Sequence, residues 1–237
     1  MLKFDAHGIL VDTQAGDGGD SANRAGLWAL LGHAQPLDLF EQKGFLVRHP
    51  FQEPWNHPGN FTRDQLLPYV AGLWRQGEIA AARRVFWRHL RRGFFAQNLD
   101  RDQPGTRKKP WPHRYRDDRD ERAFSWFDFA DPLMPDHIFH LILCARLWPL
   151  YFFGILGYPW LLINIFGHGL FSRSDDEGQI LSQCLRAGRP FVAFYRFVKP
   201  DYRESLRRYW DERRRMGEIA DALIEQVEVN PRLQTLD

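Results

Sequence analysis

The chain has little of what marks several common classes of protein. Only two of its 237 residues are cysteines, Cys144 and Cys184, which favours two small buried side chains over a disulfide framework or a metal cluster. The 32 Lys and Arg nearly balance the 30 Asp and Glu, so the strong basic excess of a nucleic-acid binder is missing. A Walker loop, a Rossmann fingerprint and a His-Glu-x-x-His motif are also missing, which removes the usual nucleotide, dinucleotide and zinc interpretations.

The first ten residues, Met1 to Leu10, lack the basic start and the continuous apolar stretch of a signal peptide. A cytoplasmic protein is therefore the default expectation. What the chain does have is a 44% hydrophobic content, enough for a packed core, and 15% aromatic residues. Such a composition suits a core of large rings or a surface that stacks on flat ligands such as sugars.

Helical runs that end at a glycine and are followed at once by another helical run are the most repeated pattern. They are typical of antiparallel helix pairs with short connections. One run covers Ser21 to Leu31, and a second begins at Thr62 and Gln65, which have capping-box spacing, and ends near Gly77. The run from Glu78 to about Gly93 has an Arg-rich outer face.

Helical patterning resumes in the second half of the chain, in segments that begin at about Asp136 and at 175–187, 200–215 and 217–227. Alternation of strand length is confined to Phe45–Val47 and Phe191–Phe197. Residues 98–122 predict a long charged surface loop or lid between two helical halves. The sequence thus predicts a single all-α domain over residues 1–237, built of stacked antiparallel helical hairpins.

The window from Leu147 to Ser172 contains no Lys, Arg, Asp or Glu over 26 residues. A bilayer crossing needs about 20 mostly apolar residues, so the window is long enough to span a membrane. Prolines and glycines divide it into two pieces joined at 157–159, and basic residues flank both ends. The pattern favours two buried helices, and membrane association by one span or a re-entrant pair is the alternative.

A glycine-rich turn, residues 17–21, leads into the first expected helix. Asp20 or Ser21 can cap that helix, and Asp20 can pair with Arg24, four residues further on. In a functional interpretation, Asp17 and Asp20 line a cleft in which Arg24 holds one carboxylate ionised for base or metal work. Gly-Asp-Ser also opens the nucleophile block of a large class of esterases, but the flanking residues do not match that block.

A stiff polar loop is expected between residues 48 and 65, where three prolines restrict the backbone. Its charged, titrating and aromatic side chains include Arg48, His49, Trp55, His57, Arg63 and Asp64. Asp64 falls in the first turn of a helix, so stabilisation of the helix dipole is its alternative role.

Asp136, His137 and His140 stand at the start of another expected helix, with the two histidines three residues apart on one face. They are potential metal ligands, but no third or fourth ligand stands in a recognised zinc frame. Hydrogen-bonded, partly buried histidines are the favoured interpretation, and no metal is predicted.

Gly19-Asp20-Ser21, Arg48-His49-Pro50 and the segment Phe61 to Gln65 together resemble a pattern of uncharacterised bacterial and phage proteins, written Gly-Asp-Ser, Arg-His-Pro and Phe-Ser-Arg-Asp-Gln. The resemblance covers mainly residues 16–77, with a weaker likeness at 131–140 and 201–210, and Thr62 replaces the serine of that pattern. Chains of this kind are similar to α/α toroids that bind and cleave polysaccharides with acidic residues, His, Arg and Trp at the hairpin ends. The resemblance implies a sugar groove by analogy at the level of the fold.

The leading hypothesis is a carbohydrate-active or carbohydrate-binding protein, as a polysaccharide hydrolase or lyase, whose cleft is built from the turns at 17–24, 48–65 and 128–140. The catalytic candidates are Asp20, Asp64, His49 and His137. The candidates for substrate binding are Arg24, Arg48, Trp55, His57, Arg63 and Asp136. Whether the chain is an enzyme, and whether it uses a cofactor, stays open from the sequence.

A second hypothesis is a non-enzymatic interaction protein that associates with a membrane through residues 147–172. Its Arg-rich helices at 83–92 and 203–215 would then face anionic head groups. A nucleic-acid binder that uses the same arginines is disfavoured, because Asp and Glu are interleaved with them near 116–122 and 201–212.

Overall fold

The computed structural model describes residues 1–11, 18–42, 45–53, 55–56, 61–94, 133–171 and 177–229, with the backbone alone for 168–171 and 229. The loop expected at 98–122 lies outside these residues. Within them, regular structure is helical apart from two short antiparallel strand pairs, so the all-α prediction is confirmed. The arrangement of the hairpins as a toroid stays a prediction.

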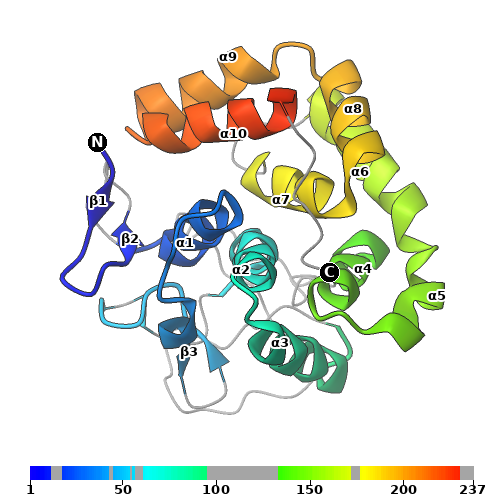
Figure 1. The fold of residues 1–237 in the computed structure, drawn as a ribbon, viewed down its shortest axis with the longest axis horizontal. Helices are drawn as coiled ribbons and strands as arrows, with labels where there is room; N and C mark the ends of the chain where they lie inside the picture. Colours follow the sequence, from blue (N-terminus) through cyan, green and yellow to red (C-terminus); the bar gives the residue numbers. More distant parts are fainter. Residues whose placement is uncertain are drawn as a thin grey trace, which may run out of the picture.

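Ten α-helices follow one another along the described residues: α1 (Ser21–Leu30), α2 (Arg63–Arg75), α3 (Ile79–Arg91), α4 (Pro135–Cys144), α5 (Tyr151–Gly154), α6 (Gly157–Phe171), α7 (Glu177–Ala187), α8 (Arg189–Val198), α9 (Tyr202–Leu206) and α10 (Gly217–Val229). Shorter helical elements are η1 (Leu37–Phe40), η3 (Trp148–Leu150) and the π-helical η5 (Arg207–Arg213). Figure 1 shows α1 and α2 end-on in the middle of the molecule, with α9 and α10 along one edge and α5, α6 and α8 along another.

The strands are two residues long and lie near the N-terminus. β1 (Lys3–Phe4) pairs with β2 (Leu10–Val11), and β3 (Glu41–Gln42) pairs with β4 (Phe45–Leu46). The strand signal at Phe45–Val47 is therefore confirmed, whereas the one at Phe191–Phe197 is wrong, because those residues lie in α8. Alternation alone did not distinguish the two cases, since α8 buries residues three apart on one helical face.

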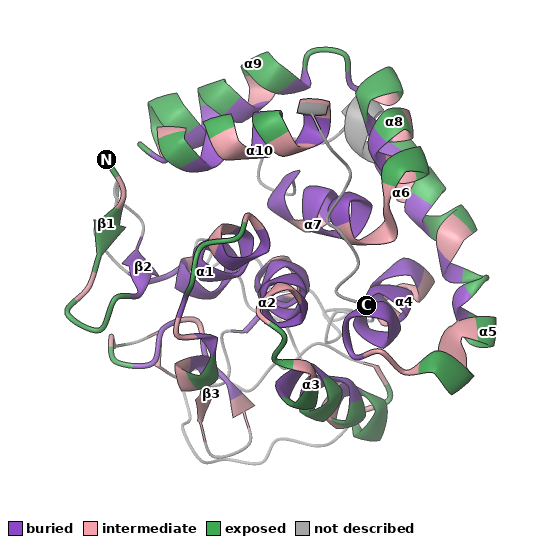
Figure 2. Cartoon of the chain, in the orientation of Figure 1, coloured by how far each residue is buried: buried purple, intermediate pink, exposed green. Residues whose placement is uncertain are grey.

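Helices α1 and α2 form the centre of the core and approach each other backbone to backbone. A Cβ atom on Gly26 of α1 would overlap the backbone of Pro68 and Tyr69 in α2, and one on Gly72 would meet the Gly26 carbonyl oxygen at 2.7 Å. Only glycine permits this approach. Nearly all of both helices is buried (Figure 2).

Helix α2 turns directly into α3, as the sequence predicts. Gly77 takes a φ of 79°, and the backbone N–H of Glu78 donates to the Leu73 carbonyl, which closes the end of α2. The capping box predicted from Thr62 and Gln65 is wrong, because neither side chain caps the start of α2. The Gln65 amide bonds to α1 instead.

Residues 148–171 form η3, α5 and α6, so the division into two helical pieces is confirmed, but the junction expected at 157–159 is wrong, because the break falls at 155–156 and residues 157–159 begin α6. No single helix in the described ranges is long and apolar enough to cross a membrane; the segments Trp148–Gly154 and Gly157–Gly167 meet that criterion together, bent by 56°. The expectation that both helices are buried is wrong. Phe152 and Ile163 are more than half exposed, because the neighbouring helices cover only one side of the pair.

Candidate functional site

Helices α1 and α2 run in the same direction and begin at the same end of the molecule. Near their starts, the backbone N–H of Asn23 donates to the Gln65 side chain at 2.9 Å. Just beyond their ends, the Gln35 N–H donates to the side chain of Gln76 at 2.7 Å. The two helix starts therefore lie side by side.

Helices α4 and α7 begin near each other in the same way. The side-chain nitrogens of His137 in α4 and Gln179 in α7 lie 3.2 Å apart near the helix starts. At the other ends, Arg186 of α7 donates to the Leu143 carbonyl of α4 at 2.8 Å.

The starts of the four helices lie near one another. His140 of α4 is 3.0 Å from the Leu67 carbonyl of α2, and Gly178 of α7 lies against Asn23 of α1. At each start stands a carboxylate: Asp20, Asp64, Asp136 and Glu177. The positive ends of the helix dipoles stabilise negative charge there.

Asp20 joins α1, α2 and the residue that follows η5. Its Oδ2 accepts hydrogen bonds from Arg24 at 3.1 Å and from Arg214 at 3.0 Å, and its Oδ1 accepts one from Gln65 at 3.0 Å. The Asp20 and Arg24 ion pair expected from their spacing is confirmed, but the helix cap expected from Asp20 is not formed. Because the Arg24 side chain is only 4% exposed, Asp20 neutralises a buried cation.

Aromatic rings hold the two guanidinium groups that contact Asp20. The Arg24 guanidinium lies 4.3 Å from the ring centre of Trp210, and that of Arg214 lies 5.0 Å from the ring of Tyr209. Arg214 also donates to the Tyr209 hydroxyl at 2.6 Å. Sequence reasoning missed Arg214 and Trp210, which lie about 190 residues from Asp20 in a run of arginines that resembles a solvated helix face.

Asp64 is half-buried and lies next to Asp20. Its Oδ1 accepts a short hydrogen bond from the Thr62 hydroxyl, and its Oδ2 accepts one from Gln65 at 3.3 Å. Since the same Gln65 nitrogen bonds to Asp20, the bridged oxygens of the two carboxylates are at most about 6 Å apart. Gln65 belongs to the motif that carries the resemblance but was not among the candidate residues.

The loop of residues 45–56 supplies Arg48 and Trp55 to the same cluster. Arg48 donates to the Thr62 hydroxyl and to the Gly19 carbonyl, each at 3.3 Å, and its guanidinium lies 5.5 Å from the ring centre of Trp55. The structure therefore brings the expected turns at 17–24 and 48–65 together. We call Asp20, Arg24, Arg48, Trp55, Asp64, Gln65 and Arg214 the polar cluster.

The described contacts of His49 are with residues other than the two carboxylates. Its ring lies under Gly18, its Nδ1 accepts hydrogen bonds from the N–H groups of Phe51 and Gln52, and its Nε2 is 3.4 Å from an Asp5 oxygen. Burial lowers the pKa of His49, and Asp5 opposes part of that shift. These contacts shape the loop and do not place His49 beside Asp20 or Asp64.

Asp136 and His137 form a second group of bonded side chains. The Asp136 Oδ2, on a residue 3% exposed, accepts hydrogen bonds from Gln183 at 2.8 Å and from Asn164 at 3.1 Å. The Nδ1 of His137 accepts from the N–H of Met134 at 3.2 Å. Burial lowers the pKa of His137 to about 4; Asp136 opposes this shift, and the positive charge of Arg63 adds to it.

The described residues of the third expected turn, Asp136 and His137, therefore form a separate buried group. The half-buried Arg63 influences it only through the pKa of His137.

Asp17, His57 and residues 128–132 lie outside the described residues. Cys144 and Cys184 are buried free thiols, as expected. In the described ranges no three or more His, Cys, Asp or Glu side chains are grouped to hold a metal ion.

Comparison of the chain with protein-family models, with curated proteins and with solved structures finds no match.

Proposed function

We propose that the polar cluster binds a carbohydrate-like ligand and that its two carboxylates hydrolyse a glycosidic bond. The observation that carries the proposal is the Gln65 bridge, which holds Asp20 and Asp64 at most about 6 Å apart. In retaining glycosidases, two carboxyl groups about 5 to 5.5 Å apart flank the bond that is cleaved. Both residues are half-buried, so each has part of its surface open to a ligand.

The environments of the two carboxylates differ and suggest different roles. Arg24 and Arg214 contact the same oxygen of Asp20 and stabilise its negative charge. Asp20 is thus suited to oppose the positive charge that develops on a sugar ring in the transition state. The described partners of the Asp64 carboxyl are uncharged, namely Thr62 and Gln65, so its negative charge is stabilised less than that of Asp20, and Asp64 is the better candidate of the two to exchange a proton with the glycosidic oxygen.

Trp55 and Arg48 supply the binding surface. A half-buried indole ring offers a flat apolar face on which a sugar ring stacks. The neighbouring Arg48 guanidinium offers donors for sugar hydroxyl groups. A ligand of alternating apolar faces and hydroxyls matches this pair better than an ionic or purely apolar ligand.

The test is binding and cleavage of a panel of soluble polysaccharides by the full chain, followed by calorimetry and an assay for new reducing ends. We expect Asp64→Asn to lower turnover at least about a hundredfold, which is the scale of lost general acid catalysis, with a melting temperature close to that of the unsubstituted chain. Trp55→Ala should weaken binding about tenfold.

The matched control is Asp221→Asn, because Asp221 is 70% exposed on α10 and its substitution removes one carboxylate far from Asp20 in the chain. It should change neither binding nor turnover. The proposal is refuted if the unsubstituted chain binds no member of the panel, or if Asp64→Asn and Trp55→Ala behave like the control. Asp20→Asn is a less informative variant, because it leaves the buried Arg24 without its carboxylate.

A further inference from the structure

Apart from Asn164, which bonds to Asp136, residues 157–167 of α6 are apolar, yet about half of these positions are exposed. Gly157, Leu161 and Ile165 recur every four residues and are buried. Leu162 and Ile163, between them, are 39% and 61% exposed. A helix that is hydrophobic all round normally lies inside a protein core or in contact with lipid.

The uncovered apolar surface extends from α6 into the neighbouring elements. We define the apolar strip as the exposed apolar side chains of residues 148–166 together with Phe197 of α8, which is 82% exposed. Ten of the fifteen exposed large apolar side chains among the described residues belong to it. Since α5, α6 and α8 lie along one edge of the molecule (Figure 1), this surface is concentrated in one region.

The segments that form the strip carry positive charge only. Residues 148–166 contain no charged side chain, and α8 contains Arg189 and Arg196 and no Asp or Glu. Arg189 and Arg196 are exposed on the same helix as Phe197. Arg196 also acts electrostatically on the Glu228 carboxylate and on Tyr202. A surface that is apolar and edged by exposed cations is complementary to anionic lipid.

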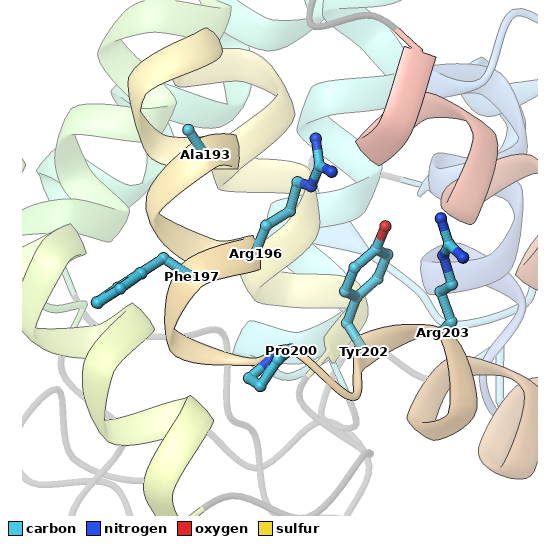
Figure 3. Close-up of a pocket in the computed structure, with 6 residues that line it drawn as sticks. All are labelled: Ala193, Arg196, Phe197, Pro200, Tyr202 and Arg203. Atoms are coloured by element: carbon cyan, nitrogen blue, oxygen red, sulfur yellow. The ribbon is translucent and has the colours of Figure 1, made fainter.

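A hollow of about 530 Å³ lies at the end of α8, next to Arg196 and Phe197. It is lined by Ala193, Arg196, Phe197, Pro200, Tyr202 and Arg203. Figure 3 shows Arg196 and Tyr202 pointing the same way, while Phe197 points away from them. Arg203 is bonded to Glu228, and no described residue forms a hydrogen bond with the exposed Arg196 guanidinium, so Arg196 is the better placed of the two to meet a phosphate group; Phe197 extends from the other side of the helix.

We infer that the apolar strip lies flat on a membrane that contains anionic lipids, with Arg189 and Arg196 against the head groups. The bend of 56° between the α5 and α6 segments suits insertion in the plane of the surface rather than a crossing. Trp148 and Trp160 place amphipathic rings at the depth of the head groups.

A second copy of the chain is the competing occupant. In a twofold dimer the same surface meets itself, so the strip of one copy would face the strip of the other. The exposed Arg189 and Arg196 at its edge would then approach the same cations of the other copy, which disfavours association. Lipid is therefore the partner that satisfies both the apolar surface and the charge.

The experiment is sedimentation of the full chain with vesicles of phosphatidylcholine alone and of phosphatidylcholine mixed with phosphatidylglycerol. We expect binding to the mixed vesicles and release by alkaline carbonate. Phe152→Asp and Ile163→Asp should each lower the partition coefficient at least about tenfold. Arg189→Gln and Arg196→Gln should each lower it about fivefold.

The matched controls are Leu90→Asp and Arg91→Gln, at exposed positions of α3, and they should bind like the unsubstituted chain. Melting curves verify that every variant is folded. Equal binding to both kinds of vesicle, resistance to carbonate, or equal losses in the α3 controls would overturn the inference. So would the absence of vesicle binding together with a dimer that Phe152→Asp dissociates, because the strip would then be an interface between copies.

Discussion

Two helix pairs, α1 with α2 and α5 with α6, use glycine in the same way to pack inward. Gly26 and Gly72 let the backbones of α1 and α2 touch. Gly154 and Gly157 let α5 and α6 lie on the ring of Phe139 in α4, where a Cβ atom on either glycine would overlap that ring. Close approach is obtained in both pairs by the absence of a side chain.

The same two pairs differ in what they present where the packing ends. The starts of α1 and α2 carry the polar cluster, in which side chains from distant parts of the chain bond to one another. The outer side of α5 and α6 carries the apolar strip, whose exposed side chains are Trp, Phe, Ile and Leu. In both pairs, glycine sets how closely the helix packs against its neighbours. The character of the outward-facing side chains is independent of that packing, being polar in one pair and apolar in the other.

The largest loss of stability is expected where the backbones of α1 and α2 are closest. We expect Gly26→Ala to cost at least about 4 kcal/mol, because the new methyl group would overlap backbone atoms of α2 that cannot rotate away. The loss should appear as a much lower urea midpoint or as absence of a cooperative transition.

Gly167→Ala in α6 is the control for this substitution. Its Cβ would meet no atom within 4 Å, so the change adds the same methyl group to a helix without a clash. It should leave stability unchanged or raise it by up to about 1 kcal/mol, as alanine favours the helix. Equal losses of stability in Gly26→Ala and Gly167→Ala would contradict the prediction that only Gly26 is needed for close helix packing.

A pair of neighbouring leucines separates the inner and outer sides of α6. Leu161 is 4% exposed and Leu162 is 39% exposed. We expect Leu161→Ala to cost about 3 kcal/mol through the cavity that it leaves, and Leu162→Ala to cost less than about 1 kcal/mol. Chemical unfolding in urea without lipid measures both values.

Similar losses of stability in Leu161→Ala and Leu162→Ala would contradict the difference between the inner and outer sides of α6. Such a result would mean that the outer side of α6 is covered in solution, for instance by a second copy of the chain. Repeating the measurement over a range of protein concentrations distinguishes that case, because the stability of a dimer depends on concentration.

Local patterns predicted most of the helices and one contact of the polar cluster. Helical spacing and the glycine stops gave the α2 and α3 hairpin closely, since both signals act within a few residues. The pair Asp20 and Arg24 was predictable for the same reason, because four residues bring two side chains onto one face.

Contacts between distant segments were not predictable from such patterns. Gln65 has the spacing of a capping residue, but it bonds to Asn23 and Asp20, which the packing of α1 places beside it. Arg214 reaches Asp20 only once the chain after η5 has folded back over α1. The outer side of α6 also escaped prediction, since an apolar sequence alone does not tell a buried helix from one in contact with lipid.

The smallest of the expected effects concerns α4, which packs against both pairs and carries buried histidines. Burial lowers the pKa of His140 to about 3, although its bond to the Leu67 carbonyl opposes the shift. The folded protein therefore holds His140 neutral, while the unfolded chain takes up a proton near pH 6.5. The stabilisation is complete above pH 6.5 and is lost as the pH falls toward about 3.

His140→Gln keeps a donor for the Leu67 carbonyl and does not titrate. Between about pH 6.5 and about pH 5, we expect this variant to lose about 1.5 kcal/mol less stability than the unsubstituted chain. Urea midpoints across this pH range measure the difference. His89, whose pKa burial lowers to about 4, gives an independent check, because His89→Gln should reduce the pH dependence further in a double variant. An unchanged slope in the double variant would mean that acid acts through other groups, and the buried histidines would then not set the acid sensitivity of the inner helices.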